Sequence, residues 1–384
     1  MFDKNMSRRE AMGVALKGVA YAAGTIPAAA VPTATSAAPT MLLADATIAI
    51  FGGFHNGFAS VRAGTQYGFI DKTGALAIPP QFDDVGRFSL GRAPVKMGDK
   101  WGFADATGVL VIPASFDDAF NFFPESGLAS VRVRDKWGFI DITGALIIPA
   151  TFDDVGDFAI ALPNSTTVAD IASPPSPLAP VNVGDRWGYI DRSGAFAIQP
   201  QFEKAFAFTA DGVAPVTLGG KGYIDMAGKF VVPAQYDDTY LFASEGLVSV
   251  QMGNKWGYVS TKTGQVVLPP TFDAAREFSG GVAAVKVSGK SGLVRPDGSF
   301  AVPPQFTSLE SPDPKGFSLV QTADEKWGFI DRTGMLVTPL FQDTFIFTDG
   351  LARAQMDGLY GFIDRTGMFV IPPQFAPNPD AIDL

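Results

Sequence analysis

The stretch DKWGFIDITGALIIPATFDDV, Asp135 to Val155, decides the fold, because the chain carries nearly the same residues 36 positions earlier as DKWGFADATGVLVIPASFDDA, Asp99 to Ala119. Alignment on the glycine that follows the tryptophan extends the match to nine units, with steps of 34, 36, 50, 34, 35, 35, 36 and 33 residues. The anchor glycines are Gly68, Gly102, Gly138, Gly188, Gly222, Gly257, Gly292, Gly328 and Gly361. A period of this length indicates a repeat architecture in which each unit buries its apolar face against its neighbours.

Each unit has the pattern of three short antiparallel strands. In the third unit, GLASVRV alternates like a half-buried strand, WGFID runs back, and ALIIP follows a tight turn at Asp141 to Gly144. Aspartate accepts backbone donors two residues on, and glycine adopts the positive φ that such a turn needs. Proline has no backbone N–H to donate to a neighbouring strand, so Pro149 predicts a strand end or a sheet edge. The FDDV segment that follows is expected to be a connecting loop.

The tryptophan position is expected to pin one unit to the next. All five tryptophans, Trp101, Trp137, Trp187, Trp256 and Trp327, stand directly before the anchor glycine. Burial of one indole removes roughly 150–250 Å² from water, which corresponds to about 4–6 kcal/mol before entropy is subtracted. The glycine after the tryptophan predicts a close approach by a neighbouring ring or backbone.

These residues resemble the bacterial WG-repeat family, whose units have the form KWGYID-x-TG-x-x-VIPP-x-[FY]-D followed by F-x-x-GLA-x-V. The segments DKWGFIDITGALIIPATFDD and FFPESGLASVRV follow that pattern, and the resemblance covers residues 54–375. It implies a β-rich repeat array, often in exported or envelope-associated bacterial proteins, without an assigned catalytic activity. The fifth and seventh units, KGYID and SGLVRPDG, depart from the pattern because they lack the tryptophan.

We expect an all-β protein, an open superhelical array of nine three-stranded antiparallel β-meander repeats, with a closed β-propeller-like ring as the alternative. Propeller blades generally have four strands and number about four to eight. The first unit begins at Phe54 and the last ends at Phe375, which leaves no shared strand to lock a ring. An insertion at 161–180 accounts for the step of 50 residues, and its Pro, Ser and Thr content predicts an exposed loop. Residues 39–53 are expected to be a linker and 376–384 a disordered tail.

The first 38 residues resemble a twin-arginine export signal. Ser7, Arg8 and Arg9 precede a weakly apolar Ala/Gly/Val segment and a Pro/Ala/Thr stretch. Small residues at Ala28 to Ala30 and at Thr35 to Ala37 are two candidate cleavage sites. We therefore expect a periplasmic or extracellular location, with a disordered leader on a cytoplasmic protein as the alternative. No segment after the signal is apolar over a length that spans a bilayer.

Composition excludes several classes of site. The chain of 384 residues has 39 acidic and 29 basic side chains, a net charge of −10, which disfavours nucleic acid as a partner. It has no cysteine, and His55 is its one histidine, so disulfides, thiolate metal sites and histidine triads are excluded. Neither SGK at 288–290 nor GGKG at 219–222 has the spacing of a phosphate-binding loop. We expect no cofactor and no metal.

The charged residues of the repeat are expected to have structural roles. Acidic pairs recur at Asp83-Asp84, Asp117-Asp118, Asp153-Asp154 and Asp237-Asp238. Glycosidase carboxyls lie about 5–10 Å apart across one sugar, and calcium takes six to eight oxygens from one loop. Neighbouring carboxylates repeated in the same loop meet neither demand, so we expect them to cap their own loops. His55 is expected on the surface of the first unit. The basic residues before the tryptophans either stack on rings or face solvent; they include Lys100, Lys136, Arg186, Lys255 and Lys326.

The pattern favours a non-enzymatic, monomeric repeat protein that binds or scaffolds a protein, peptide or glycan partner in the bacterial cell envelope. The alternative is a carboxylate-dependent hydrolase acting on envelope polysaccharide, and a third hypothesis is a structural spacer. A catalytic pair would consist of acids that break the repeat pattern, and the candidates are Glu125, Glu203, Glu245, Glu277 and Glu310. We assign no catalytic, cofactor-binding or metal-binding residue, and the binding residues are not identified by the sequence.

Overall fold

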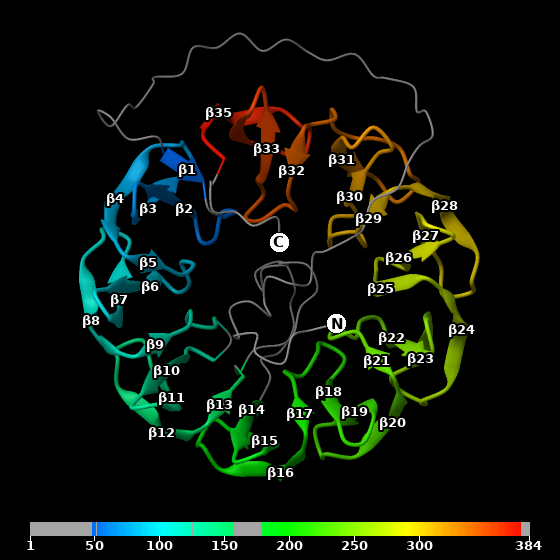
Figure 1. Ribbon diagram of the computed structural model, residues 1–384, viewed down its shortest axis with the longest axis horizontal. Coiled ribbons are helices and arrows are strands. Elements are labelled where there is room, and N and C mark those ends of the chain that lie inside the picture. The colour runs from blue at the N-terminus through cyan, green and yellow to red at the C-terminus, as the bar shows by residue number, and fades with distance from the viewer. Residues whose placement is uncertain (1–47, 51, 125, 157, 159–177, 378–384) are drawn as a thin grey trace.

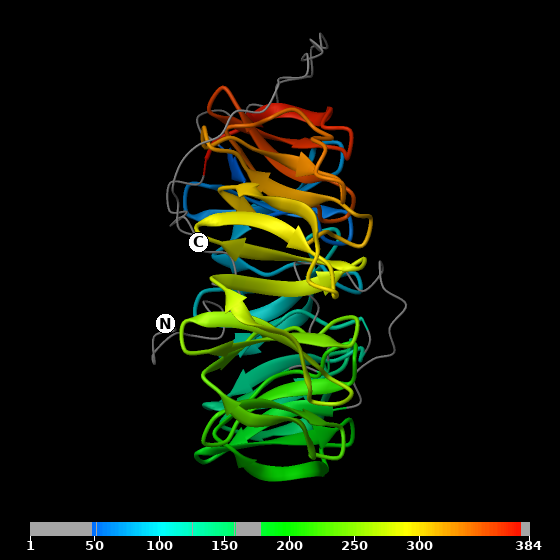
Figure 2. The same ribbon diagram turned by 90° about the vertical axis from the view of Figure 1, so that its right-hand side faces the viewer.

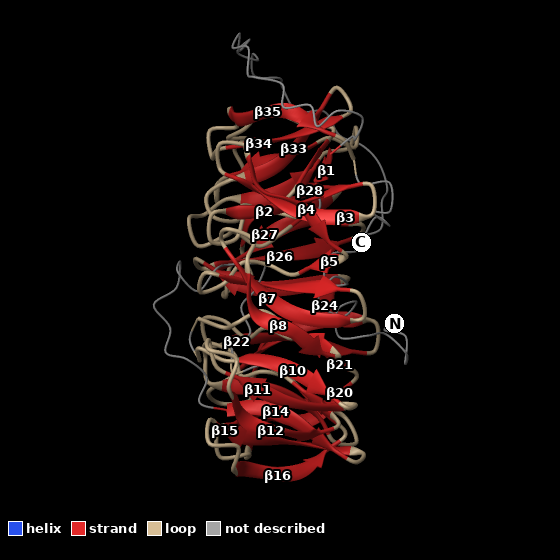
Figure 3. Cartoon of the chain, turned by 90° about the vertical axis from the view of Figure 1, so that its left-hand side faces the viewer, coloured by secondary structure: helices blue, strands red, loops and turns tan. Residues whose placement is uncertain are grey.

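The computed structural model describes residues 48–50, 52–124, 126–156, 158 and 178–377. These residues form nine small antiparallel sheets that stand around a centre as the blades of a closed ring, a nine-bladed β-propeller (Figure 1). Seen from its edge, the ring is a disc that is wider than it is thick (Figure 2). The described part of the chain consists of strands and loops without a helix (Figure 3). The expected all-β class and the nine repeats are confirmed.

The strands of each blade follow one another from the innermost to the outermost (Figure 1). Blade 1 comprises β1 (Ile48–Ile50), β2 (Phe58–Ala63), β3 (Gln66–Asp71) and β4 (Leu76–Phe82), and blade 2 comprises β5 (Asp84–Val85), β6 (Arg92–Met97), β7 (Lys100–Asp105) and β8 (Leu110–Phe116). Blade 3 comprises β9 (Asp118–Ala119), β10 (Ala129–Val133), β11 (Lys136–Ile140) and β12 (Leu146–Phe152), and blade 4 comprises β13 (Asp154–Val155), β14 (Leu178–Val183), β15 (Arg186–Asp191) and β16 (Phe196–Phe202).

The same order continues around the ring. Blade 5 comprises β17 (Lys204–Ala205), β18 (Val213–Thr217), β19 (Lys221–Asp225) and β20 (Phe230–Tyr236), and blade 6 comprises β21 (Asp238–Thr239), β22 (Leu247–Met252), β23 (Lys255–Ser260) and β24 (Val266–Phe272). Blade 7 comprises β25 (Ala274–Ser279), β26 (Val282–Val287), β27 (Lys290–Val294) and β28 (Phe300–Phe306). Blade 8 comprises β29 (Ser308–Leu309), β30 (Ser318–Gln321) and β31 (Trp327–Ile330), and blade 9 comprises β32 (Asp343–Thr344), β33 (Ala352–Met356), β34 (Leu359–Ile363) and β35 (Phe369–Phe375).

Blades other than blade 8 have four strands, so the expected meander of three strands is wrong by one. The extra strand is the segment expected to be a connecting loop. In blade 3 it is β9, which pairs with β10 through Ala119 and Val131. Asp118 Oδ1 accepts the N–H of Ala119 at 2.9 Å, which holds the dipeptide extended beside β10. Each repeat of the sequence therefore ends inside the next blade.

The outermost strand bulges over the anchor glycine. The register between β11 and β12 shifts from Trp137 opposite Phe152 to Phe139 opposite Ile148, and Pro149 lies in the bulge. A Cβ on Gly138 would lie 2.5 Å from the backbone oxygen of Ile148. The predicted close approach at the glycine is thus made by backbone of the same blade. Pro149 sits on an outer edge strand, where a missing N–H is tolerated.

The ring two positions after the tryptophan makes the main contact between blades. Phe139 is 1% exposed and packs on Phe158 of blade 4, with ring centroids 5.1 Å apart. The equivalent pairs are Phe69–Phe88, Phe103–Phe122, Tyr189–Phe208, Tyr258–Phe278 and Phe329–Phe347, with centroids 4.8, 4.8, 5.0, 4.8 and 4.4 Å apart. The tryptophans expected in this role are less enclosed. Trp101 and Trp137 are buried, whereas Trp187, Trp256 and Trp327 are half-buried.

The first and last blades join by the same kind of ring contact that joins most of the others, and this closes the ring. Phe362 of blade 9 packs on Phe54 with centroids 4.6 Å apart. Strand β1 takes the innermost place in blade 1, and the N–H of Ala376 donates to the oxygen of Ile48 at 3.0 Å. The preference for an open array is therefore wrong and its alternative, the closed ring, is correct. The shared strand that locks the ring comes from residues 48–50, within the segment expected to be a linker.

Several sequence expectations concern residues outside the described ranges. They include the leader at 1–38, residues 39–47 of the linker, most of the insertion at 161–180 and most of the tail at 376–384. The last three residues of the expected insertion, Leu178 to Pro180, belong to β14. Among the described residues, no helix has the length and apolar character needed to cross a membrane.

Candidate functional site

The innermost strands surround the centre of the ring, and each leads into a loop that connects it to the second strand (Figure 1). The innermost strand begins with two residues that pair with the second strand, and the residue type directly after these two varies between blades. From blade 2 to blade 9 this position holds Gly86, Phe120, Gly156, Phe206, Tyr240, Arg276, Glu310 and Phe345. Three consecutive blades thus carry polar or charged side chains where the others carry glycine or phenylalanine.

These three side chains meet. Arg276 Nη1 donates to the hydroxyl oxygen of Tyr240 at 3.0 Å, and its Nη2 forms an ion pair with Glu310 Oε1 at 2.7 Å. The side chains of Arg276 and Glu310 are 19% and 8% exposed. The backbone oxygen of Arg276 also accepts the hydroxyl of Tyr258 at 2.7 Å. One guanidinium therefore connects blades 6, 7 and 8 at the inner loops.

Glu277 adds a second carboxyl to this place. It is 2% exposed, and burial, reinforced by the charge of Glu310 and opposed by Arg276, raises its pKa to about 7. Burial disfavours the charged form of Arg276, but the charges of Glu310, Tyr240 and Glu277 outweigh it, so the pKa of Arg276 rises. Burial likewise raises the pKa of Tyr240 and of Tyr258. We call these five residues, Tyr240, Tyr258, Arg276, Glu277 and Glu310, the inner-loop charge cluster.

Backbone contacts hold the cluster in place. Ser311 Oγ of blade 8 donates to the backbone oxygen of Glu277 at 2.6 Å. The same Oγ accepts the N–H of Ala284, in β26, at 3.0 Å. A single hydroxyl thus fastens the inner loop of blade 8 to two strands of blade 7.

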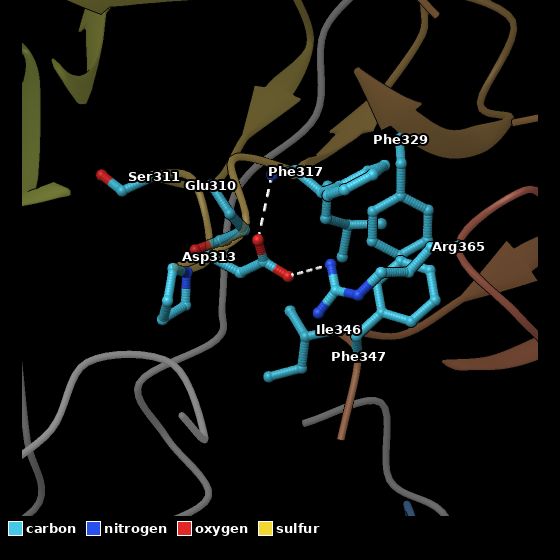
Figure 4. Close-up of a pocket in the computed structure, with 10 residues that line it drawn as sticks. Glu310, Ser311, Asp313, Phe317, Phe329, Ile346, Phe347 and Arg365 are labelled. Carbon is cyan, nitrogen blue, oxygen red and sulfur yellow. Dashed lines mark hydrogen bonds and ion pairs between the residues drawn. The ribbon is translucent and has the colours of Figure 1, made fainter. Parts of the chain in front are cut away.

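A small hollow lies beside Glu310, between blades 8 and 9 (Figure 4). Arg365 Nη1 donates to Asp313 Oδ2 at 2.5 Å, and its guanidinium carbon lies 4.9 and 4.6 Å from the ring centres of Phe317 and Phe347. Cation–π contacts of this kind stabilise a partly desolvated guanidinium. The hollow measures about 20 Å³, the space of about one water molecule. A sugar ring does not fit there.

The glutamates that break the repeat pattern lie in different environments. Glu277 and Glu310 meet in the cluster, whereas Glu203 and Glu245 are exposed. Glu203 accepts the N–H of Gly219 at 3.2 Å, and Glu245 accepts the N–H groups of Gly280 and Gly281 at 2.6 and 3.0 Å. Glu125 lies outside the described residues.

The acidic pairs bind backbone, as expected. The second aspartate of a pair accepts the N–H of the residue after it, as in Asp84 with Val85 at 2.8 Å. The first accepts a backbone N–H from the next hairpin, as in Asp83 with Gly98 at 2.6 Å. Three of the lysines before the tryptophans face solvent, one of the two alternatives, since their side chains are 41–48% exposed. They also form ion pairs with the first aspartate after the outer strand, in Lys100–Asp117, Lys136–Asp153 and Lys255–Asp273.

His55 is half-buried in the inner loop of blade 1, where its N–H donates to the oxygen of Phe58 at 2.8 Å. Burial, followed by the charge of Arg87, lowers the pKa of its imidazole to about 3. The ring is therefore neutral at physiological pH. Across the described ranges, no three of the histidine and acidic side chains gather in a group that could hold a metal ion.

Sequence reasoning missed Arg276 and Tyr240, because it considered acids alone as pattern-breaking residues. The signal was present in the repeat alignment, in which Tyr240, Arg276 and Glu310 occupy one column. This alignment position holds glycine or phenylalanine in the other units. Polar residues at the same position of consecutive units are predicted to contact one another, because consecutive units are neighbours in the ring.

Comparison with known proteins supports the repeat and the fold. The family model described as "WG containing repeat" matches residues 67–101, 101–137, 137–159, 187–221, 222–256, 256–290, 327–360 and 360–376. No curated protein matches this chain in sequence.

Among solved structures, a crystal structure of the eukaryotic initiation factor is similar with a TM-score of 0.54 and 14% identity, over 80% of this chain and 91% of that one. The dihydro-heme d1 dehydrogenase NirN is similar with a TM-score of 0.43 and 13% identity, over 77% of this chain and 76% of that one. BamB from Moraxella catarrhalis is similar with a TM-score of 0.38 and 15% identity, over 74% of this chain and 90% of that one. The first of these likenesses supports the propeller fold, and none of them carries an activity over to this chain.

Proposed function

This chain belongs to the WG containing repeat family, and we propose that it is a non-enzymatic scaffold that binds a protein, peptide or glycan partner in the bacterial cell envelope. One observation carries the proposal. The residues that recur in most units are used to join blades, as Phe139 does with Phe158 and Lys136 with Asp153. The residues that differ between units gather on the inner loops, so specificity resides there.

The inner loops also offer exposed rings to a partner. Phe206 and Phe345 occupy the variable position in blades 5 and 9 and are 38% and 37% exposed. They flank the blades that carry the inner-loop charge cluster. Aromatic side chains next to charged groups on a rigid framework are typical of residues that dominate binding energy.

The alternative, a polysaccharide hydrolase, has less support. A glycosidase needs two carboxyls on either side of a sugar. Glu310 instead forms an ion pair with Arg276 at 2.7 Å, and Glu277 is 2% exposed. A carboxyl so enclosed cannot reach a glycosidic oxygen unless the inner loops move.

A capture experiment tests the proposed binding face. Tagged wild-type protein and a Phe206→Asp/Phe345→Asp variant are incubated with envelope extract and, separately, with an array of envelope glycans. We expect the wild type to retain a defined partner and the variant to lose it. The matched control is Phe300→Asp on the outer strand β28, where the ring is 38% exposed and its loss should leave binding unchanged.

Two outcomes would contradict the proposal. If Phe206→Asp/Phe345→Asp and Phe300→Asp lose binding equally, the inner loops are not the binding face. Cleavage of a glycan by the wild type, abolished by Glu310→Gln, would favour the hydrolase.

The proposed location rests on the leader and has its own test. Fractionation of cells that produce the full chain with a carboxyl-terminal tag should place the tag in the envelope fraction. Substitution of Arg8 and Arg9 by lysine should leave it in the cytosol, because the paired arginines are the feature that resembles an export signal. A cytosolic tag with both arginines intact would contradict the envelope location.

A further inference from the structure

The guanidinium of Arg365 lies in a cage of two rings and a carboxylate between blades 8 and 9 (Figure 4). Its carbon is 4.9 Å from the ring centre of Phe317 and 4.6 Å from that of Phe347. Its Nη1 donates to Asp313 Oδ2 at 2.5 Å. Aromatic faces and a carboxylate are the groups that bind a planar cation in proteins. We call Asp313, Phe317 and Phe347 the guanidinium cage.

The walls of the cage are held by contacts that do not involve Arg365. Asp313 Oδ1 accepts the N–H groups of Lys315 and Phe317 at 2.9 and 3.0 Å, which leaves Oδ2 for the guanidinium. Phe347 packs on the buried ring of Phe329, with centroids 4.4 Å apart. The cage should therefore keep its shape when Arg365 leaves it, and a preformed site loses little freedom on binding.

The side chain of Arg365, by contrast, is not needed by the turn that carries it. Asp364 Oδ1 accepts the N–H groups of Thr366 and Met368 at 2.8 and 3.2 Å, and these bonds close the turn. The Arg365 side chain is 22% exposed, so it can rotate out of the cage into solvent without a change of backbone. The equivalent turn position holds other residue types in blades 2, 3 and 5, namely Ala106, Ile142 and Met226.

The cage requires a phenylalanine at the position of Phe317 and a cation in the turn of the next unit. The residues at this position in the other blades are Phe58, Arg92, Leu128, Leu178, Val213, Leu247, Val282 and Leu351. Phe58 is the one other phenylalanine, and the turn of the unit after it holds Ala106. By sequence, phenylalanine and arginine therefore coincide at blades 8 and 9 alone. A feature of one interface in nine is not required by the repeat, which favours a role in recognition.

We propose that the guanidinium cage binds an arginine side chain of a protein partner, and that Arg365 occupies the cage until the partner displaces it. The proposal rests on the proposed binding function and names the chemistry of the partner. Displacement is close to neutral at the cage, because the incoming guanidinium makes the contacts that Arg365 gives up. Net affinity then comes from contacts outside the cage, as with the exposed ring of Phe345, two residues before Phe347.

A titration of the full chain with a short peptide tests the cage. The probe is acetyl-Gly-Ser-Arg-Ser-Gly-amide, and the same peptide with citrulline in place of arginine has the same shape without the charge. Calorimetry or NMR measures binding to the wild type and to Arg365→Ala. The arginine peptide should bind Arg365→Ala roughly tenfold more tightly than the wild type, since a site that is open about a tenth of the time binds about tenfold more weakly. The citrulline peptide should bind Arg365→Ala about tenfold more weakly than the arginine peptide does.

Two further variants separate the cage from charge alone. Addition of Asp313→Asn to Arg365→Ala should weaken binding of the arginine peptide about tenfold, because a charge-assisted hydrogen bond is lost. Lys72→Ala is the matched control. Lys72 stands at the same turn position in blade 1, with its Nζ 3.6 Å from Asp349 Oδ2, but Leu351 takes the place of Phe317 there. This variant exposes an acid without a cage, so it should bind the peptide as the wild type does.

Arg365→Lys covers the case in which Arg365→Ala does not fold. Lysine keeps the charge and lacks the planar group that stacks on the rings, so the arginine peptide should still bind this variant more tightly than the wild type. Equal affinity of the wild type and both variants for the arginine peptide, or equal affinity of the arginine and citrulline peptides, would overturn the cage. Capture of an envelope partner together with either result would leave the proposed binding function standing. Binding in the cage without any captured partner would count against the binding function alone.

Discussion

The ring of Phe54 packs edge-on against that of Phe362, with centroids 4.6 Å apart and an interplanar angle of 64°. The two residues come from the first and the last blade, at opposite ends of the repeat region. Their contact has the same form as Phe69 with Phe88 in neighbouring units, at 4.8 Å and 73°. The seam where the chain closes is therefore built like six of the other interfaces between blades.

Phe362→Ala should destabilise the protein by about 3–5 kcal/mol, because it removes a fully buried ring and leaves a cavity at the seam. Unfolding in denaturant, followed by far-UV circular dichroism, measures the change. Phe300→Ala, on an outer strand with the ring 38% exposed, should change stability by about 0.5 kcal/mol at most. Similar values for the two variants would mean that the seam does not contribute to stability.

Tyr189→Phe should cost about 1 kcal/mol. The hydroxyl of Tyr189 donates to the backbone oxygen of Phe206 in the next blade at 2.9 Å, and its loss removes one hydrogen bond between blades 4 and 5. The ring itself should fit, because Phe139 fills the equivalent place in blade 3. Thermal unfolding of the variant is the measurement, and an unchanged melting temperature would show that this hydrogen bond adds nothing to the ring.

Gly138→Ala should destabilise by about 3 kcal/mol, because the new Cβ would lie 2.5 Å from the oxygen of Ile148, which belongs to backbone and cannot move aside cheaply. Gly52→Ala is the control, since the nearest atom to a Cβ there is Ser60 Oγ at 3.4 Å. Urea unfolding compares the two. A mild effect at Gly138 would indicate that the bulge of β12 is absent in solution.

His55 should remain neutral well below the pH at which a free imidazole gains its proton. Burial and Arg87 lower its pKa to about 3 from 6.5, so protonation opposes folding and stability falls as the pH drops below 6.5. The chain has one histidine, so the two C–H resonances of its imidazole can be assigned to His55 directly in a proton NMR titration. No shift of these resonances between pH 8 and pH 5 is expected, and a midpoint near 6.5 would contradict the placement of His55.

The sequence predicts what depends on local chemistry. The turn at Asp141 to Gly144, the glycine beneath the bulge and the self-capping acidic pairs all follow from residues a few positions apart. Asp141 Oδ1 accepts the N–H of Thr143 at 2.9 Å, and Gly144 has a φ of 88°, as the turn requires. The turn aspartate and glycine recur in seven of the nine units and the anchor glycine in all nine, so the units could be counted from the sequence alone.

Closure of the ring could not be predicted in this way. It depends on the small rotation between successive blades, summed over nine of them, and on Ile48 to Ile50, which do not resemble any part of the repeat that was used for alignment. The fourth strand was missed because Asp118 and Ala119 form a strand of two residues, too short for a periodic pattern. The charge cluster could be predicted only in part. Glu277 and Glu310 stand out as acids that break the repeat pattern, whereas Arg276 stands out only when the position after the innermost pair is compared between units.

Closure of the ring through β1 is tested most directly by a cross-link between its two ends. Ala49 and Ala376 are paired in a parallel bridge, and the chain has no cysteine of its own, so Ala49→Cys/Ala376→Cys introduces a single possible disulfide. Mild oxidation of the folded variant should produce a species that migrates faster on a non-reducing denaturing gel. The control Ala49→Cys/Ala197→Cys, with the second cysteine on the outer strand of blade 4, should not. Failure of the first pair to form a disulfide in the folded protein, or equal cross-linking of both pairs, would contradict the closed ring.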